Sequence, residues 1–501
     1  MRKLYILFTF TLLLSACDLD REPYGVSDYW NTEEDVMMGL NAAYAPLYEE
    51  EGFGRGQFWL GGACDDMVTN RPIAEVISVT NFETMVNASG NVYANWQLMY
   101  EVIRRCNDVM KHAEFVNMTA KNKDIALGEA NFLNAFSYFF LAKRYGGVPF
   151  YDYKNPQEIN KKRETLTETY TRIVAYLETA IAHFEAQQLW KRSDSEWGRP
   201  NLGAAYTLMA KVYAYWGKYD KCKEYTTKVI GHYTLNTTDN NGYAHLFSPK
   251  GETHEEVLFN LTCNAVRHEG TVTSVILLSN MLSDGTGWGY FAPTKSLYDA
   301  YKKGDTRRDV TIIGAGNTVN YLGKKVKITD KQMADMQTGY MCAKYAAAYE
   351  GLTSWQWESG ADIPLLRYAD ALLLDAEADI FLAGGGPGNR TLGVPTAAKS
   401  FNEVRLRAFG GDVSKKISSP TFNDLMNERR CELAYEDDRH FDLVRWGLAK
   451  EVYNNSATND PRGARNFDPQ KHAYFPLPQK EIENSDNVLV NNPLKGYSSF
   501  E

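Results

Sequence analysis

Three clusters of aromatic residues, each set among glycine and polar residues, are the strongest candidates for chemistry in this sequence. They comprise Trp59 with Asp65, Asp66 and Arg71; Trp288 with Tyr290 and Phe291; and Trp355 with Trp357. Indole and phenol rings stack on flat ligand faces, such as the C–H face of a sugar ring, while carboxylates and guanidinium groups hydrogen-bond its hydroxyls. Because binding residues concentrate on loops, we expect at least one cluster to contact a ligand, although burial is the commoner fate of any single ring.

A concentration of charged residues near the C-terminus looks at first like a catalytic centre. It comprises Glu428, Arg429, Arg430, Glu432, Arg439, Asp442 and Arg445. Glu428 and Glu432 would share one helix face and repel each other unless an arginine pairs with them. We expect no nucleophile and no metal-binding residue to act together with these charges. We therefore predict a partly buried ion-pair network that joins the C-terminal helices to the helical repeats.

The sequence contains no motif that predicts an enzyme or a cofactor. His254-Glu255-Glu256 lacks the second histidine of a zinc-binding helix, no G-x-S-x-G elbow is present, and the glycine patches lack the Lys-Ser/Thr of a phosphate loop. A glycoside hydrolase needs two carboxylates that face each other across the sugar, and no such pair can be named. We expect no catalytic residue and no cofactor. The sequence leaves open whether a structural calcium ion binds at Asp65-Asp66 or at Asp437-Asp438.

The N-terminus carries the features of a lipoprotein signal peptide. Arg2 and Lys3 precede a largely apolar stretch, residues 4–14, that is too short to span a bilayer as a helix. It ends in Leu14-Ser15-Ala16-Cys17, and small residues before a cysteine indicate cleavage after residue 16 and lipid on Cys17. Residues 17–31 would then form an acidic, lipidated tether that holds the protein on a membrane. An ordinary secretory signal with an accidental cysteine, followed by a plain solvated linker, is the alternative.

The net charge bears on the possible binding partners, and the cysteine content bears on the possible disulfides. The net charge is −9 and no long basic run occurs, which argues against nucleic acid. Beyond Cys17, the cysteines are scattered without a C-x-x-C motif, so their disulfide state stays open, and we expect most to be buried as small apolar residues. These are Cys64, Cys106, Cys222, Cys263, Cys342 and Cys431.

Helical patterns dominate residues 32–235. Thr32 and Asp35 can form a capping box that starts a helix reaching about residue 47. Further helices are predicted for residues 92–112, 125–145 and 165–185. Residues 205–230 combine helical spacing of apolar residues with a Gly217-Lys218-Tyr219 turn, which is typical of a tetratricopeptide hairpin. Stacked pairs of this kind give a curved scaffold.

The periodicity breaks down from residue 236 to about 362, where turn residues are frequent and short β-like runs occur, such as residues 272–276. Helices return at residues 364–382, 397–408 and 422–435, and a final stretch covers 442–453. The predicted fold is therefore mostly α. Tetratricopeptide-like helical hairpins form a curved scaffold packed against an irregular, loop-rich region with a few short strands, in one domain over residues 32–501 whose C-terminal helices and tail begin at 363.

Several blocks of sequence resemble, in order and spacing, the SusD/RagB family of outer-membrane nutrient-binding lipoproteins of Bacteroidetes. The blocks are GEANFLNA (128–135) with YGGVP (145–149), GRP with AAY (198–206), DIPLLRYAD (362–370) with AEA (376–378), NERRCELAYE (427–436) with DLVRWG (442–447), and PLPQ with NNP (476–493). Two departures are visible: Asn134 stands where Arg is usual, and Asp437-Asp438 where Gly is common. We expect neither to change the fold class.

The resemblance implies a non-catalytic, single-domain protein with four tetratricopeptide-like units and a shallow, exposed ligand site that differs between members. It implies a lipid-anchored protein facing the extracellular side of the outer membrane. Such proteins act as the lid of a SusC-like TonB-dependent transporter, to which this chain would deliver a captured oligosaccharide or polysaccharide. A peptide-binding or other nutrient-binding lipoprotein of the same architecture, and a lipid-anchored glycoside hydrolase, are the alternatives.

Overall fold

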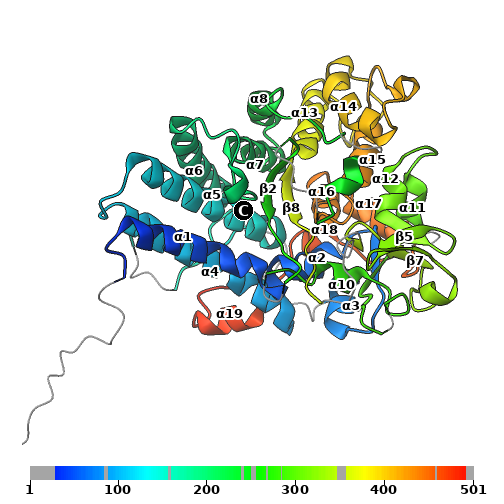
Figure 1. Cartoon of the computed structure of the whole chain (residues 1–501), viewed down its shortest axis with the longest axis horizontal. Coiled ribbons are helices and arrows are strands. Elements are labelled where there is room, and N and C mark those ends of the chain that lie inside the picture. The colour runs from blue at the N-terminus through cyan, green and yellow to red at the C-terminus, as the bar shows by residue number, and fades with distance from the viewer. Residues whose placement is uncertain are drawn as a thin grey trace, which may run out of the picture.

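The computed structural model describes residues 29–83, 88–155, 160–237, 242–249, 255–266, 269–283, 285–346, 357–456 and 460–491. The predictions for the signal peptide, for Cys17 and for Trp355 concern residues outside these ranges. Within them the fold is mostly α-helical with short strands, as the sequence predicts (Figure 1).

Paired helices build a scaffold in which successive members pack side by side (Figure 1). The contacts join α1 to α4, α4 to α5, α5 to α6, α7 to α8, α8 to α13 and α13 to α14. The helices are α1 (Glu33–Tyr48), α4 (Gly90–Ala113), α5 (Ala120–Tyr145), α6 (Leu166–Ala186), α7 (Leu202–Tyr215), α8 (Tyr219–Val229), α13 (Tyr368–Leu382) and α14 (Ala398–Ala408).

The ends of the long helices confirm the predicted capping. In α1 the Asp35 amide donates to the Thr32 hydroxyl at 3.2 Å, and the Thr32 amide donates to the Asp35 carboxylate at 2.8 Å. This reciprocal pair satisfies backbone donors that have no partner inside the helix. α5 ends at Tyr145 because Gly146 adopts φ +76°, which favours glycine. The α7–α8 hairpin turns at Gly217, where φ is +73°.

Short strands form two-stranded antiparallel pairs, of which β5–β6 is a local hairpin and the others join segments farther apart in the chain. The pairs are β1 (Met67–Thr69) with β3 (Phe291–Pro293), β2 (Val257–Leu261) with β8 (Ile363–Arg367), β4 (Ile312–Gly314) with β7 (Tyr340–Cys342), and β5 (Thr318–Tyr321) with β6 (Lys324–Lys327). The β2–β8 pair lies between the helical scaffold and the loop-rich part in Figure 1 and contacts α7.

The structure corrects two predicted elements. The helix expected over residues 364–382 begins only at Tyr368, because Ile363–Arg367 pairs with β2. The β-like run at residues 272–276 is largely the short helix α10 (Thr273–Leu277). Its β-branched residues favour strands, but tertiary contacts override that preference. The Thr273 hydroxyl donates to the Gly54 carbonyl at 2.8 Å, and Val275 and Ile276 are fully buried.

Shorter helices complete the molecule. Gly447, with φ +70°, separates α16 from α17 and divides the predicted stretch at residues 442–453. Besides short 3-10 turns, the described ranges also contain η1, a π-helical turn (Glu50–Gly54), α2 (Gly56–Gly61), α3 (Ala74–Thr80), α9 (Gly242–His245), α11 (Lys295–Ala300), α12 (Arg307–Thr311), α15 (Phe422–Glu432), α16 (Arg439–Arg445), α17 (Ala449–Asn454), α18 (Pro469–His472) and α19 (Gln479–Asn484).

Buried ion pairs connect α15 and α16 to the scaffold, which confirms the predicted network. Arg429 pairs with Asp370 of α13 at 2.9 Å and with Asp442 of α16 at 3.0 Å. Glu432 pairs with Arg367 at 2.9 Å and with Arg307 at 3.0 Å. These side chains are almost completely shielded from solvent. Each charge is therefore compensated where water cannot reach it, as buried ions require.

The cysteines from Cys64 to Cys431 are all buried and none forms a disulfide. Burial raises the pKa of their thiols, for example that of Cys64 to about 12, so they pack as small apolar residues, as predicted. Among the residues that the structure describes, no helix combines the length and the apolar character that a membrane crossing requires.

Candidate functional site

Four aromatic side chains, drawn from all three predicted clusters, lie against one another. The Tyr290 ring lies 6.0 Å from Trp59 and 5.6 Å from Trp288, and Trp288 lies 5.5 Å from Trp357, measured between ring centroids. We call these four rings the aromatic platform. The sequence predicts the clusters separately, and the fold brings them to one place.

The platform rises from the core to the surface. Trp59 is 2% exposed, Trp288 and Tyr290 are half-buried, and Trp357 is 56% exposed. An indole as exposed as that of Trp357 leaves much apolar area in water unless something covers it. The outer three rings can therefore touch a ligand, while Trp59 supports Tyr290 from below.

Backbone hydrogen bonds hold the loop that carries Trp288 and Tyr290. The Trp288 amide donates to the Val275 carbonyl at 2.8 Å, and the Tyr290 amide donates to the Ile276 carbonyl at 2.7 Å. Gly289 between them adopts φ +51°, a conformation that costs a side-chain-bearing residue energy. β3 then pairs with β1, which ties the loop to the segment that follows α2.

Arg71 and its neighbour Asn70 fasten the same loop from the side. The Arg71 guanidinium donates to the Trp288 carbonyl through Nε and to the Gly287 carbonyl through Nη2. The Asn70 amide donates to the Tyr290 carbonyl at 2.7 Å. Arg71 is partly exposed, and no carboxylate among the described residues pairs with it. It therefore places a cation with donors to spare at the edge of the platform.

Arg55 and Glu51 complete the site, although they are absent from the predicted residues. The Arg55 guanidinium lies 5.2 Å from the Trp59 ring and 5.8 Å from the Trp288 ring, within the range of cation–π attraction. Glu51 pairs with Arg55 at 2.5 Å and accepts from the Trp59 indole. Burial raises the pKa of Glu51 above its usual value. Glu51, Arg55 and Trp59 stand four residues apart, a helical spacing that the sequence does contain.

Asp65, Asp66 and Phe291 are shielded from solvent, and the Phe291 ring packs against Trp59. Asp65 pairs with Arg439 at 2.8 Å and with Arg430 at 3.0 Å, and Asp66 pairs with Arg430 at 2.7 Å. Desolvation opposes ionisation of Asp65, but the two arginines outweigh it and hold its pKa well below the ordinary value. The side chains of these three residues therefore pack and pair inside the protein and do not face an open surface.

Asp65-Asp66 and Asp437-Asp438, the two acidic pairs considered for a calcium ion, both pair with cationic side chains. Asp437 pairs with Lys143 at 2.8 Å and Asp438 with Lys211 at 2.8 Å. Within the described ranges, no group of three or more His, Cys, Asp or Glu side chains is placed to hold a metal ion. The chemistry that the platform offers is stacking, together with hydrogen bonds from Arg71.

The comparisons with known proteins agree with this architecture. Residues 255–497 match the model of the SusD family, and residues 19–214 match a model described as starch-binding, associating with outer membrane. SusD-like protein P2 of Formosa agariphila is 26% identical, with 98% of this chain and all of that protein covered. Starch-binding protein SusD of Bacteroides thetaiotaomicron is 25% identical, with 78% of each chain covered.

A solved structure shows the same fold. Surface glycan-binding protein A from Bacteroides thetaiotaomicron superposes with a TM-score of 0.75 at 24% identity, with 93% of this chain and all of that one covered. That protein has also been solved in complex with laminarihexaose. Two family models that together span most of the sequence, full-length relatives and a shared mostly helical fold lead to one conclusion: the chain belongs to the SusD/RagB family.

Proposed function

We propose that this protein is a cell-surface lipoprotein that captures a glycan on the aromatic platform and delivers it to a SusC-like TonB-dependent transporter. The observation that carries the proposal is the exposed Trp357 ring set against Trp288 and Tyr290. The names of the relatives support the ligand class, since one is a starch-binding protein and another has been solved with laminarihexaose.

Capture would rest on the two kinds of contact that the platform offers. A sugar ring presents its C–H face to the Trp357 or Trp288 indole, and Arg71 donates hydrogen bonds to its hydroxyls. A surface site of this kind excludes little water, so each sugar contributes modestly and affinity grows with the number of units engaged. The ligand would accordingly be an oligosaccharide or polysaccharide.

The anchor and the partner are part of the same proposal. Cys17 would carry the lipid, residues 17–31 would act as the tether, and the protein would lie on the outer face of the outer membrane. The match to a model described as associating with outer membrane supports this location. A gene for a SusC-like transporter beside the gene for this chain would support the proposed pairing with such a transporter.

The binding test compares the parent protein with the variant that carries both Trp288→Ala and Trp357→Ala. Calorimetry against starch, laminarin and a panel of other polysaccharides should find at least one ligand for the parent protein and a loss of at least tenfold in affinity for the variant, because two stacking rings are removed. Phe115→Ala is the matched control, since Phe115 is 80% exposed and follows the C-terminal end of α4. Equal affinity of parent and double variant would refute the platform as the site.

Two further outcomes would decide against glycan capture itself. Binding of oligopeptides without any binding of polysaccharide would favour a peptide-binding protein of the same architecture. New reducing ends appearing when the purified protein meets a polysaccharide would favour a hydrolase.

A further inference from the structure

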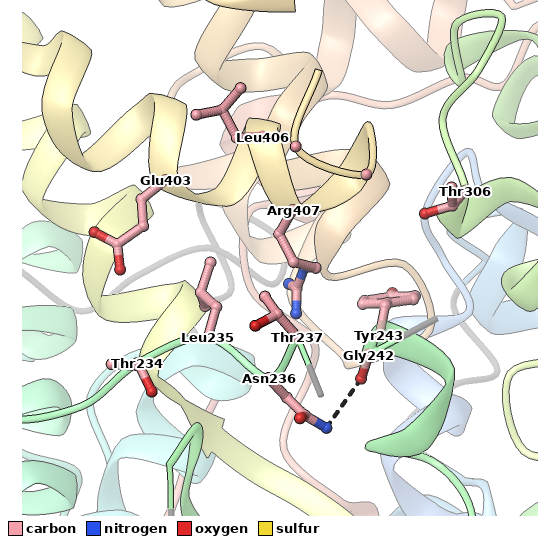
Figure 2. A pocket seen from close by; sticks show the side chains of 12 residues that line it. Thr234, Leu235, Asn236, Thr237, Gly242, Tyr243, Thr306, Glu403, Leu406 and Arg407 are labelled. Carbon is pink, nitrogen blue, oxygen red and sulfur yellow. Dashed lines mark hydrogen bonds between the residues drawn. The ribbon is translucent and has the colours of Figure 1, made fainter. Parts of the chain in front are cut away.

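A cavity of about 570 Å³ opens beside α14, away from the aromatic platform. Its wall is formed by Glu403, Leu406 and Arg407 of α14, by residues 234–237 after α8, and by Thr306 (Figure 2). In Figure 1, α14 lies at the top and α2 and α10 lie towards the bottom, so the cavity and the platform occupy different parts of the molecule. The volume falls within the usual range for small-molecule sites.

Glu403 has no ion-pair or hydrogen-bond partner among the described residues, although it is half-buried in the wall of this cavity. Burial raises the pKa of its carboxyl, and the charge of Lys399 opposes that shift only in part. A half-buried carboxylate without a donor is costly unless a ligand or water supplies one. Glu403 is therefore an acceptor available to an occupant of the cavity.

Arg407 projects from the same helix towards the 234–237 segment (Figure 2), and its charge is already compensated. It pairs with Glu256 at 2.9 Å and with Glu432 at 2.5 Å, and its guanidinium covers the Tyr243 ring at 5.2 Å. A bound anion would therefore meet a neutralised cation, and a flat aromatic ligand would find the Tyr243 ring covered. The Nε of Arg407 is buried without an acceptor among the described residues.

The remaining polar lining consists of hydroxyl and amide groups. Thr234, Thr237 and Thr306 are exposed at the cavity. The Thr306 hydroxyl donates to the Ala408 carbonyl at 3.0 Å, and its oxygen can still accept a hydrogen bond from a ligand. Asn236 is held in place by its amide, which donates to the Gly242 carbonyl at 3.1 Å (Figure 2). Gly410 and Gly411 line the cavity without side chains, and a Cβ at either would meet no atom within 4 Å.

We propose that this cavity is a second binding site, for a neutral polyhydroxylated molecule the size of a mono- or disaccharide. Hydroxyl groups both donate and accept, so they can serve Glu403 and the threonine oxygens together. An ammonium ligand at Glu403 would lie one helical turn from the Arg407 guanidinium, because residues four apart share a helix face. The site acts through hydrogen bonds and not through stacking, and it does not depend on the platform.

The test uses the full chain carrying Trp288→Ala and Trp357→Ala, so that sugars do not stack on these two rings of the platform. Saturation-transfer NMR and calorimetry with maltose, cellobiose and lactose should show saturable binding of at least one disaccharide. Glu403→Gln, which keeps the shape, should weaken it at least fivefold. Thr237→Trp, at an exposed position, should abolish it by filling the cavity. Glu178→Gln removes an equally charged, exposed side chain on α6 and should leave affinity unchanged.

Two results would overturn the second site: none of the three disaccharides binds, or a disaccharide binds equally well to the Thr237→Trp variant. Because the starting variant lacks both tryptophans on which the platform would stack a sugar, these results bear on the cavity. Conversely, disaccharide binding by this variant together with no polysaccharide binding by the parent protein would uphold the cavity and refute glycan capture at the platform.

Discussion

The indole rings of Trp288 and Trp357 meet edge to face, with centroids 5.5 Å apart and planes at 89°. Aromatic pairs favour this arrangement because the positive edge of one ring approaches the negative face of the other. The two rings form a corner and not a flat stack. A ligand can therefore lie against one face while its side rests on the other ring, which suits a bulky, three-dimensional sugar chain.

Removing Trp59 should cost far more stability than removing Trp357. Trp59→Ala deletes a ring that is 2% exposed, and large core deletions cost about 3–5 kcal/mol, so the free energy of unfolding should fall by that order. Trp357→Ala deletes a ring that is 56% exposed and should change stability by less than about 0.5 kcal/mol. Urea unfolding of both variants checks this. A stability loss for Trp357→Ala as large as that for Trp59→Ala would show that the outer ring is part of the core.

Arg71 should control the order of the loop that carries Trp288. Its guanidinium donates to two carbonyls of that loop, and a lysine cannot reproduce a planar fork. Arg71→Lys and Arg71→Met should therefore both increase amide hydrogen exchange in residues 285–291, because charge-assisted hydrogen bonds contribute about 1.5–3 kcal/mol. Lys295→Met is the control, since Lys295 is exposed and pairs with Asp299. Full protection in the lysine variant would mean that charge alone holds the loop.

The sequence predicts local features well where the cause is local. Thr32 and Asp35 cap α1 as expected, and Gly146 ends α5, because capping and a positive φ depend on a few neighbouring residues. The β-like residues 272–276 form a short helix instead. Contacts with Gly54, which is distant in sequence, and with the loop that carries Trp288 and Tyr290 decide that outcome.

The site shows the same division between local and distant causes. The sequence identifies Trp288, Tyr290 and Trp357 as loop aromatics, but it cannot tell that the fold brings these separate segments together. It also groups Asp65 with the binding residues, because its partners Arg430 and Arg439 lie far along the chain. Only the folded structure shows that this carboxylate is already paired.

Arg367 should be the most sensitive single residue of the buried network. It pairs with Glu256 at 2.8 Å, Glu432 at 2.9 Å and Glu436 at 2.7 Å. Arg367→Met removes a cation that all three carboxylates share, although Glu256 and Glu432 keep Arg407, and breaking such a buried pair costs about 3–5 kcal/mol. Arg104→Met removes an exposed partner of Glu101, where surface pairs contribute about 0.2–1 kcal/mol. Denaturant midpoints that fall equally for both variants would contradict a structural role for the network.

His440 should make the protein less stable in mild acid. The imidazole is buried between Phe82 and Tyr453, and this burial, before any other cause, lowers its pKa to about 3. In the unfolded chain it titrates near its ordinary value of about 6.5. Between these values the unfolded state binds the extra proton, so the free energy of unfolding decreases as the pH falls from 6.5 towards 3, by at most about 5 kcal/mol. His440→Gln cannot take up that proton, and its unfolding free energy should depend less on pH across this range, whatever its absolute stability. Urea titrations of the parent and the variant at pH 7 and pH 4.5 measure the difference, and parallel losses in both proteins would assign the acid sensitivity to other groups.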